Sequence, residues 1–146
     1  MSWLHRLRRL PALDRRLLLE AVLLLGLVRA ALALLPFATV QDLAARWSAV
    51  RRFRHSAQPT AARVALAVQV ASRYVPHAAC LAHALAAHRL LARYGYGSHI
   101  QIGVIKRPGA PLQAHAWVEC NGRVVIGDTG QLEQYTILSA TRSMAL

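Results

Sequence analysis

Residues 115–128, which read HAWVECNGRVVIGD, decide the fold of the second half of the chain. Asn121-Gly122 is the strongest short signal for a β-hairpin, and it predicts a two-residue type I′ turn. Apolar and polar residues flank this turn in a way that predicts strands over 112–120 and 123–128. Residues 98–106 alternate with the same period of two, so we expect a three-stranded antiparallel meander.

The short turn also predicts which residues face each other across the hairpin. Cys120 should lie opposite Arg123, and counting back along both strands places His115 opposite Asp128. Directly opposed residues share one face of a sheet, with Cβ atoms about 4.5–5.5 Å apart. A carboxylate at that distance can hold an imidazole N–H. We therefore predict a His115–Asp128 pair on the face that also carries Trp117, although such a pair alone is more often structural.

Helices are expected to precede this sheet. Apolar residues at helical spacing predict them over residues 17–35, 42–52, 60–74 and 79–94. Thr60 is the expected N-cap of the third helix, and Gly95 is expected just after the last one. The predicted class is α+β, with an N-terminal helical region over 1–58 and a core over 59–146 in which a helix packs on an antiparallel sheet.

Composition narrows the class of protein. The chain has 146 residues, 55% of them hydrophobic, and two cysteines, which excludes a disordered tail and a disulfide-stapled scaffold. Its net charge is +12, and nearly all the basic residues are arginine. This charge reflects either a compositional bias or attraction to an anionic partner. No nucleic-acid-binding motif accompanies it, so we expect no nucleic-acid partner.

The apolar run of residues 17–35 follows a basic start, as in a secretion signal or a membrane anchor. Glu20 and Arg29 interrupt the run, and a charged residue at a membrane centre costs about 2.5–3.5 kcal/mol. We therefore favour a buried or partner-packed helix in a cytoplasmic protein. Membrane association is disfavoured but stays open.

Cys80 completes a chemical centre with the hairpin. It stands where the 79–94 helix begins, and a helix N-terminus favours the thiolate, which is the nucleophilic form. His115 can take its proton, and Asp128 would fix the imidazole tautomer. A buried structural cysteine is the alternative for Cys80 considered alone. Zinc binding by His77, Cys80, His83 and His88 is a weaker alternative because their spacing is diffuse. We expect no metal and no cofactor.

Two further residues are predicted near this centre. The backbone N–H of Cys80 can stabilise an oxyanion, and the side-chain amide of Gln69 is a candidate second donor. Trp117 shares the predicted face of His115 and could shield that ring or contact a substrate.

A pattern of residues across the second half is similar to a known family. It comprises Cys80-Leu81, Ala84-Leu85, Leu90-Leu91, Ile102-Gly103-Val104, the run from His115 to Glu119, Gly122, Val124-Val125 and Asp128. With this pattern, residues 60–130 resemble the transglutaminase-like, papain-type cysteine peptidases. More closely, they resemble the stand-alone leader peptidases of lasso-peptide biosynthesis.

The resemblance implies a function and partners. Such a peptidase removes the leader from a ribosomally made precursor peptide that a separate recognition protein presents, and a lasso-peptide cyclase then closes the ring. The resemblance implies Cys80 as the nucleophile, His115 as the general base and acid, and Asp128 as the orienting carboxylate. His83 stands where the resemblance leads us to expect a basic arginine, which makes it a candidate contact to substrate or partner. Two alternatives stay open. The first is an acyl transferase of the transglutaminase kind. The second is a non-enzymatic adaptor that docks an acidic partner through Arg51, Arg52 and Arg54.

Overall fold

The protein is represented by a computed structural model that describes residues 2–47, 58–75 and 79–142. Five helices and four strands follow one another in this part of the chain, with one short 3₁₀ turn before the last strand. They are α1 (Ser2–Arg9), α2 (Ala12–Leu34), α3 (Phe37–Trp47), α4 (Ala61–Ala71), α5 (Cys80–Arg93), β1 (Ser98–Ile105), β2 (Gln113–Cys120), β3 (Arg123–Ile126), η1 (Leu132–Gln134) and β4 (Thr136–Arg142).

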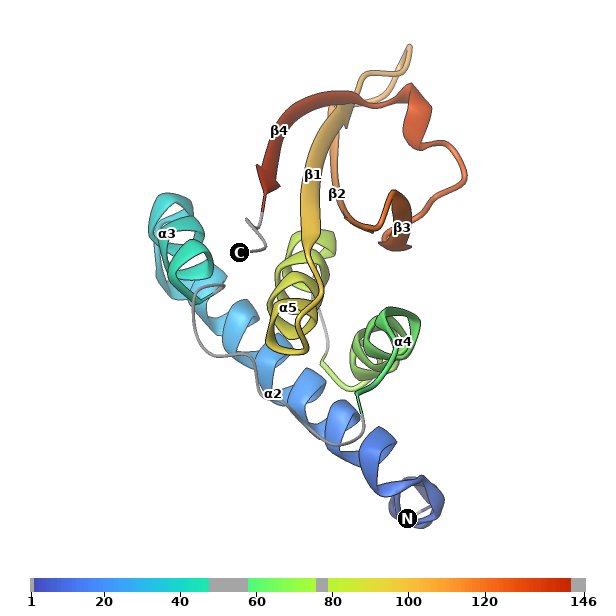
Figure 1. The fold of residues 1–146 in the computed structure, drawn as a ribbon. Helices are drawn as coiled ribbons and strands as arrows, with labels where there is room; N and C mark the ends of the chain where they lie inside the picture. Colours follow the sequence, from blue (N-terminus) through green and yellow to red (C-terminus); the bar gives the residue numbers. More distant parts are fainter. Residues whose placement is uncertain (1, 48–57, 76–78, 143–146) are drawn as a thin grey trace.

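The elements form three layers. Helices α4 and α5 lie between α2 and the sheet (Figure 1), and they contact α2 on one side and the strands on the other. One continuous apolar core joins the layers because α2 and α4 each turn one face inward and α5 is buried along much of its length. Its fully buried large members include Leu17, Leu25, Val64, Val68, Leu90, Leu91 and Val118. The predicted α+β class is confirmed.

The N-cap of α4 and the glycine after α5 are found where the sequence predicts them. The Thr60 hydroxyl accepts a hydrogen bond from the Arg63 backbone N–H at 3.2 Å, which is the expected N-cap of α4. Gly95 follows α5 with a φ of +84°, the left-handed conformation that ends many helices. Helix α3 starts five residues before the predicted 42–52 segment, whose residues 48–52 lie outside the described residues.

The sheet has the strand order β3-β2-β1-β4, and each neighbouring pair is antiparallel. The hairpin turn is confirmed, since Asn121 and Gly122 have φ values of 53° and 75°, as a type I′ turn requires. Strand β4 is an addition that the sequence pattern did not predict. It pairs with β1 along the edge opposite to β3.

The predicted hairpin register is wrong beyond the first two pairs. Cys120 pairs with Arg123 and Glu119 with Val124 as expected, but Val118 pairs with Ile126 instead of Val125. One extra residue on β3 forms a bulge, which shifts everything after it by one position. Strand β3 then ends at Ile126, so the last two residues of the predicted strand leave the sheet.

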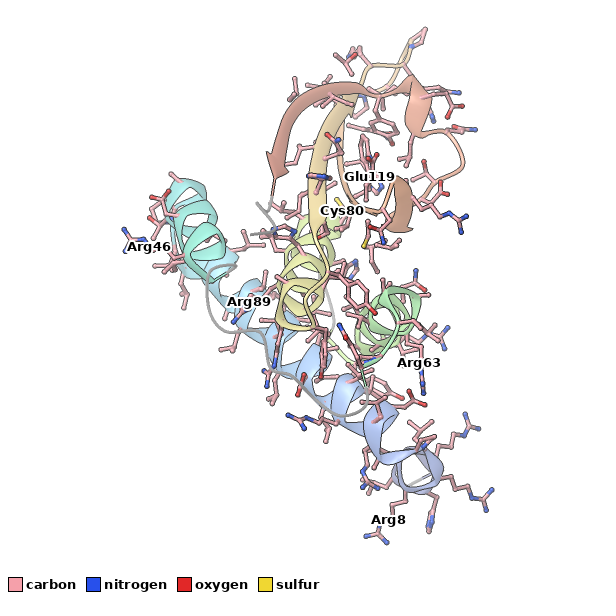
Figure 2. All side chains as sticks on the ribbon, in the orientation of Figure 1. Arg8, Arg46, Arg63, Cys80, Arg89 and Glu119 are labelled. Carbon is pink, nitrogen blue, oxygen red and sulfur yellow. The ribbon has the colours of Figure 1, made fainter. Side chains whose placement is uncertain are left out.

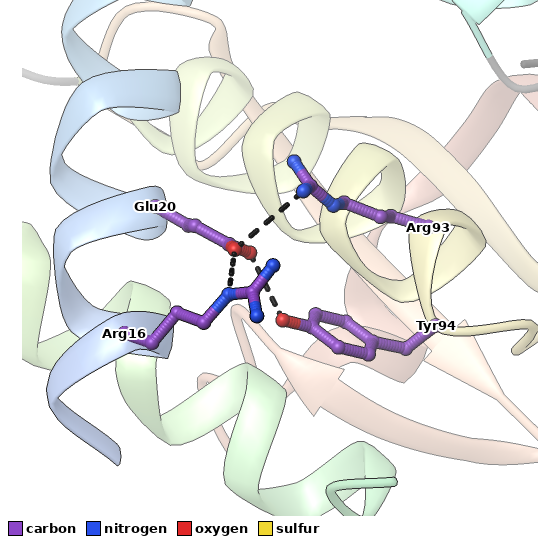
Figure 3. A network of polar contacts seen from close by, with 4 residues as sticks. All are labelled: Arg16, Glu20, Arg93 and Tyr94. Carbon is purple, nitrogen blue, oxygen red and sulfur yellow. Dashed lines mark hydrogen bonds and ion pairs between the residues drawn. The ribbon is translucent and has the colours of Figure 1, made fainter. Parts of the chain in front are cut away.

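Glu20, which interrupts the apolar run of α2, forms part of a polar network on the inner side of that helix (Figure 3). Its carboxylate accepts hydrogen bonds from Arg16 Nε at 2.9 Å and from the Tyr94 hydroxyl at 3.0 Å, and Arg93 lies 3.6 Å away. The network ties α2 to the C-terminal end of α5. Glu20 therefore has an internal structural role.

Candidate active site

A cavity of about 150 Å³ lies where α4, the start of α5 and the β2–β3 hairpin meet. The α4 helix and the hairpin contribute both apolar and polar side chains to its wall, and α5 contributes a thiol and an imidazole. The lining residues are Val68, Gln69, Ser72, Cys80, His83, His115, Ala116, Ile126 and Gly127. The fold thus brings together four residues that the sequence singled out: Cys80, His115, Gln69 and His83.

Cys80 is the first residue of α5, at the end of the helix that meets the sheet (Figure 2). The preceding residue, Ala79, has extended backbone angles and accepts the first helical hydrogen bond, from His83 N–H at 3.2 Å. The N–H of Cys80 belongs to the first turn, whose amides have no acceptor within their own helix. The thiol is half-buried and free. Cys80 therefore offers a sulfur atom and a main-chain donor at the same wall.

One side of the His115 ring is held by the main chain just after the end of β3. Its Nε2 lies 2.7 Å from the carbonyl oxygen of Gly127. Because a carbonyl oxygen only accepts, Nε2 carries the proton and donates it in this contact. In the neutral ring, Nδ1 is then the basic nitrogen. No hydrogen bond joins the Cys80 thiol to the ring in the described structure, so the two groups form separate parts of the same cavity wall.

Two aromatic rings pack around His115. Trp117 stacks on it with ring centroids 6.1 Å apart and planes inclined by 23°, and Tyr135 lies 5.7 Å away. The predicted shared face of His115 and Trp117 is confirmed by this stacking. Trp117 is only 3% exposed and is absent from the cavity lining, so it packs on the His115 ring without lining the cavity. Its proposed contact with substrate stays a prediction.

Gly127 can hold His115 only because it lacks a side chain. Its φ is +84°, and an added Cβ would lie 2.8 Å from the carbonyl oxygen of Ala116 and 3.0 Å from the Cβ of Trp117. A glycine at this position lets the chain leave β3 tightly against β2. The Gly127 carbonyl is thereby directed at the imidazole.

Asp128 does not make the contact that the hairpin count predicted. Its side chain is exposed, and Oδ1 accepts a hydrogen bond from the backbone N–H of Gly130 at 2.8 Å. Within the described residues, the Asp128 carboxylate makes no hydrogen bond or ion pair to His115. The physical reason is the bulge, which ends β3 early and brings the main chain of Gly127 to the ring. The Asp128 carboxylate instead closes the turn that follows.

Gln69 of α4 and His83 of α5 line the same cavity as the Cys80 thiol. Gln69 is exposed on the last part of α4, and no hydrogen bond to its side chain is found among the residues described. His83 is half-buried, and its Nε2 is enclosed without a partner in the described part of the chain. Burial lowers the pKa of His83, which favours a neutral ring. Both side chains can therefore offer a hydrogen bond to a bound ligand.

The zinc alternative receives no support from the geometry. In the part of the chain that the structure describes, no three His, Cys, Asp or Glu side chains group closely enough to hold a metal ion. His77, one of the ligands considered, lies outside the described residues.

Sequence reasoning missed two participants, Gly127 and Tyr135. A glycine directly after the run Val124-Val125-Ile126 was a usable signal, because a glycine at a strand end often marks a bulge or a close backbone approach. Tyr135 carried no comparable signal. It reaches His115 only through the pairing of β4 with β1.

A family model described as transglutaminase-like superfamily matches residues 22–140, which includes most of α2, the cavity and nearly all of the sheet. No curated protein and no solved structure gives a significant match.

Proposed function

The chain belongs to the transglutaminase-like superfamily, and from this premise we propose that it is a cysteine peptidase that removes the leader from a lasso-peptide precursor. The observation that carries the peptidase chemistry is the shared cavity of Cys80 and His115, with the ring anchored through Nε2. This anchoring leaves Nδ1 as the base. The identity of the substrate is supported by the sequence pattern around these residues.

The first half of the reaction forms a thioester. His115 Nδ1 takes the thiol proton of Cys80, and the thiolate attacks the carbonyl carbon of the scissile amide. The C=O π electrons move onto oxygen, which gives a tetrahedral intermediate. When this collapses, the C–N bond breaks and the imidazolium gives its proton to the leaving amine. The core peptide leaves with a free N-terminus, and the leader remains as an acyl group on sulfur.

The second half uses water. His115 removes a proton from a water molecule, the resulting hydroxide attacks the thioester carbon, and the C–S bond breaks. The proton returns to the departing thiolate. The leader is released as a carboxylic acid, and the enzyme regains its starting state. Throughout, the Gly127 carbonyl keeps the ring in one orientation, while Trp117 and Tyr135 limit its tilt.

Negative charge develops on the substrate oxygen in both halves. The N–H of Cys80 is one donor for it, and the side-chain amide of Gln69, on the same cavity wall, is the proposed second donor. Asp128 acts as a positioning residue, because its bond to Gly130 shapes the loop whose carbonyl holds His115. His83 is the proposed contact to a polar group of the substrate.

We further propose that the protein works in the bacterial cytoplasm with a separate leader-recognition protein and a lasso-peptide cyclase. A cavity of about 150 Å³ can hold the residues next to the scissile bond, while a leader peptide is much longer. A recognition partner would supply the remaining affinity by raising the local concentration of the precursor.

The test combines the purified chain, the recognition protein and the precursor peptide, with products identified by mass spectrometry. We expect cleavage at the leader–core junction by the wild-type chain and none by Cys80→Ala. Cys120→Ala is the matched control, since Cys120 is the other free cysteine but is buried away from the cavity. This variant should cleave normally.

Other outcomes would point elsewhere. A product in which an amine instead of water has accepted the leader acyl group would establish an acyl transferase with the same thioester. Full cleavage by Cys80→Ala would remove the cysteine mechanism. Cleavage of unrelated peptides but not of a lasso precursor would leave the peptidase in place and overturn its proposed substrate. The adaptor alternative depends on Arg51, Arg52 and Arg54, which lie outside the described residues.

A further inference from the structure

The outward face of α2 carries a line of exposed leucines. Leu19, Leu23 and Leu27 are 49%, 69% and 62% exposed, and Leu34 near the end of the helix is 82% exposed. Their spacing places them on one side of the helix, opposite to the buried Leu17 and Leu25. We call these four leucines the outer stripe. In Figure 1, α4, α5 and the sheet all lie on one side of α2, and the buried leucines of α2 belong to the core that it shares with α4 and α5.

Helix α2 also has the length and hydropathy of a membrane segment. Within the described residues it is the one helix that meets both criteria, and only 22% of its most apolar stretch is buried. Its inner face nevertheless packs on α4 and α5 through the protein core. Spanning a bilayer would expose that inner face and break the core. A position flat in the membrane surface would cover the outer stripe and leave the core intact.

Positive charge is placed at both ends of α2. Helix α1, which precedes it, ends in Arg6, Arg8 and Arg9. Figure 2 shows Arg8 at one end of α2 and Arg46 of α3 at the other, both directed away from the helices. Cations at both ends of an apolar stripe suit a helix whose middle enters the acyl region while its ends lie among anionic headgroups.

The acidic residues of α2 do not oppose such a surface. Asp14 is paired with Arg63 of α4, and Glu20 is bound within the network of Figure 3. Both carboxylates are thus neutralised by residues of the protein itself. From the exposed stripe, the flanking arginines and the paired acids, we propose that α1 and α2 dock the protein on an anionic lipid surface, with α2 lying in the plane of the interface.

The arrangement would leave the reaction centre accessible. The sheet lies on the far side of α4 and α5 from α2 (Figure 1). The cavity is lined by α4, the start of α5 and the β2–β3 hairpin and by no residue of α2, so a membrane covering the outer stripe does not cover the cavity. Docking and peptide cleavage are therefore separable. Loss of either one leaves the other measurable.

The test is co-flotation of the full chain with vesicles of phosphatidylcholine alone or with a quarter of phosphatidylglycerol. We expect binding to the anionic vesicles, weak binding to the neutral ones and a marked loss at high salt. Leu23→Gln with Leu27→Gln should weaken binding by at least about tenfold, since the two side chains no longer enter the bilayer. Replacing Arg6, Arg8 and Arg9 by glutamine should remove the preference for anionic lipid.

The matched control is Leu112→Gln with Leu138→Gln, two leucines of similar exposure, 62% and 65%, that lie outside α2. This pair should bind vesicles as the wild type does. Circular dichroism checks that every variant folds, and Cys80→Ala should bind normally. An equal loss in the control pair, or no binding to anionic vesicles, would overturn the proposal. The proposal would also be overturned if the protein formed a dimer or a complex with the recognition protein that depends on Leu23 and Leu27, without binding vesicles. The outer stripe would then serve a contact between proteins.

Discussion

Replacing Gly127 by alanine should damage both stability and activity, and the structure gives a size for each effect. A left-handed φ of +84° costs an L-residue about 1–2 kcal/mol. The new Cβ would also lie 2.8 Å from the Ala116 carbonyl oxygen and 3.0 Å from the Trp117 Cβ, and neither atom can move freely. Crowding of this kind costs about a further 1–3 kcal/mol. We expect a total loss of about 2–5 kcal/mol in the free energy of unfolding.

Gly130 provides the control for this substitution. Its φ is +75°, in the same loop, but an added Cβ would meet nothing within 4 Å. Gly130→Ala should therefore lose only the backbone part, about 1–2 kcal/mol. Urea denaturation of the two variants measures the difference directly, as a change in unfolding midpoint at constant slope.

Activity separates a structural role of Gly127 from a role in holding His115. If the clash moves the Gly127 carbonyl by about 1 Å, the ring loses its orientation, and kcat/KM should fall by about 100-fold under conditions where the variant is folded. Gly130→Ala should stay within a few-fold of wild type. Equal stability losses in both variants, or an unchanged kcat/KM in folded Gly127→Ala, would refute the reasoning.

Three other substitutions test separate parts of the structure. Asp128→Asn should keep kcat/KM within about tenfold of wild type, because the amide oxygen of asparagine can also accept the hydrogen bond from the Gly130 N–H. A loss of more than about a thousandfold in steady-state kinetics would show that the carboxylate itself serves His115. The pKa of His88 is lowered to about 4, mainly because the ring is buried and secondly because His99 lies nearby. As the pH falls from about 6.5 towards 4, this histidine therefore binds a proton in the unfolded chain but not in the folded one, which destabilises the folded protein. Thermal or urea unfolding should show a protein about 2 kcal/mol less stable at pH 5 than at pH 7, and His88→Gln should flatten that dependence; an unchanged slope would contradict it. Glu20→Gln should lower the free energy of unfolding by about 1–2 kcal/mol through weaker bonds to α5, and a neutral result by urea denaturation would show that the network adds nothing net.

Local signals in the sequence predicted the helices and the turn next to the site. The Thr60 cap and the Asn121-Gly122 turn each depend on a few neighbouring residues, and the structure contains both. The cap and the turn could be predicted because each is set by short-range chemistry. The meeting of Cys80 with His115 at one cavity is a long-range contact, and it was expected because a thiol at a helix start and a strand histidine together suit nucleophilic catalysis.

Long-range features could not be predicted in the same way. The bulge in β3 depends on how the strand packs against β2, and nothing in the alternation of residues 123–128 marks it uniquely. Strand β4 contains adjacent Ile137 and Leu138, both exposed, so it lacks the alternation of a half-buried strand. Its strand conformation comes from pairing with β1, a partner distant in sequence.

The main-chain support of His115 has a consequence for how the candidate site should respond to acid. A carboxylate that holds an imidazole loses this interaction once acid protonates it, whereas a peptide oxygen is uncharged over the whole working range. The Gly127 contact therefore keeps its strength in acid, and it survives any side-chain replacement nearby that preserves the course of the backbone. Relatives with other residues after the corresponding glycine could retain the same histidine geometry, and a search for a partner acid alone would overlook them.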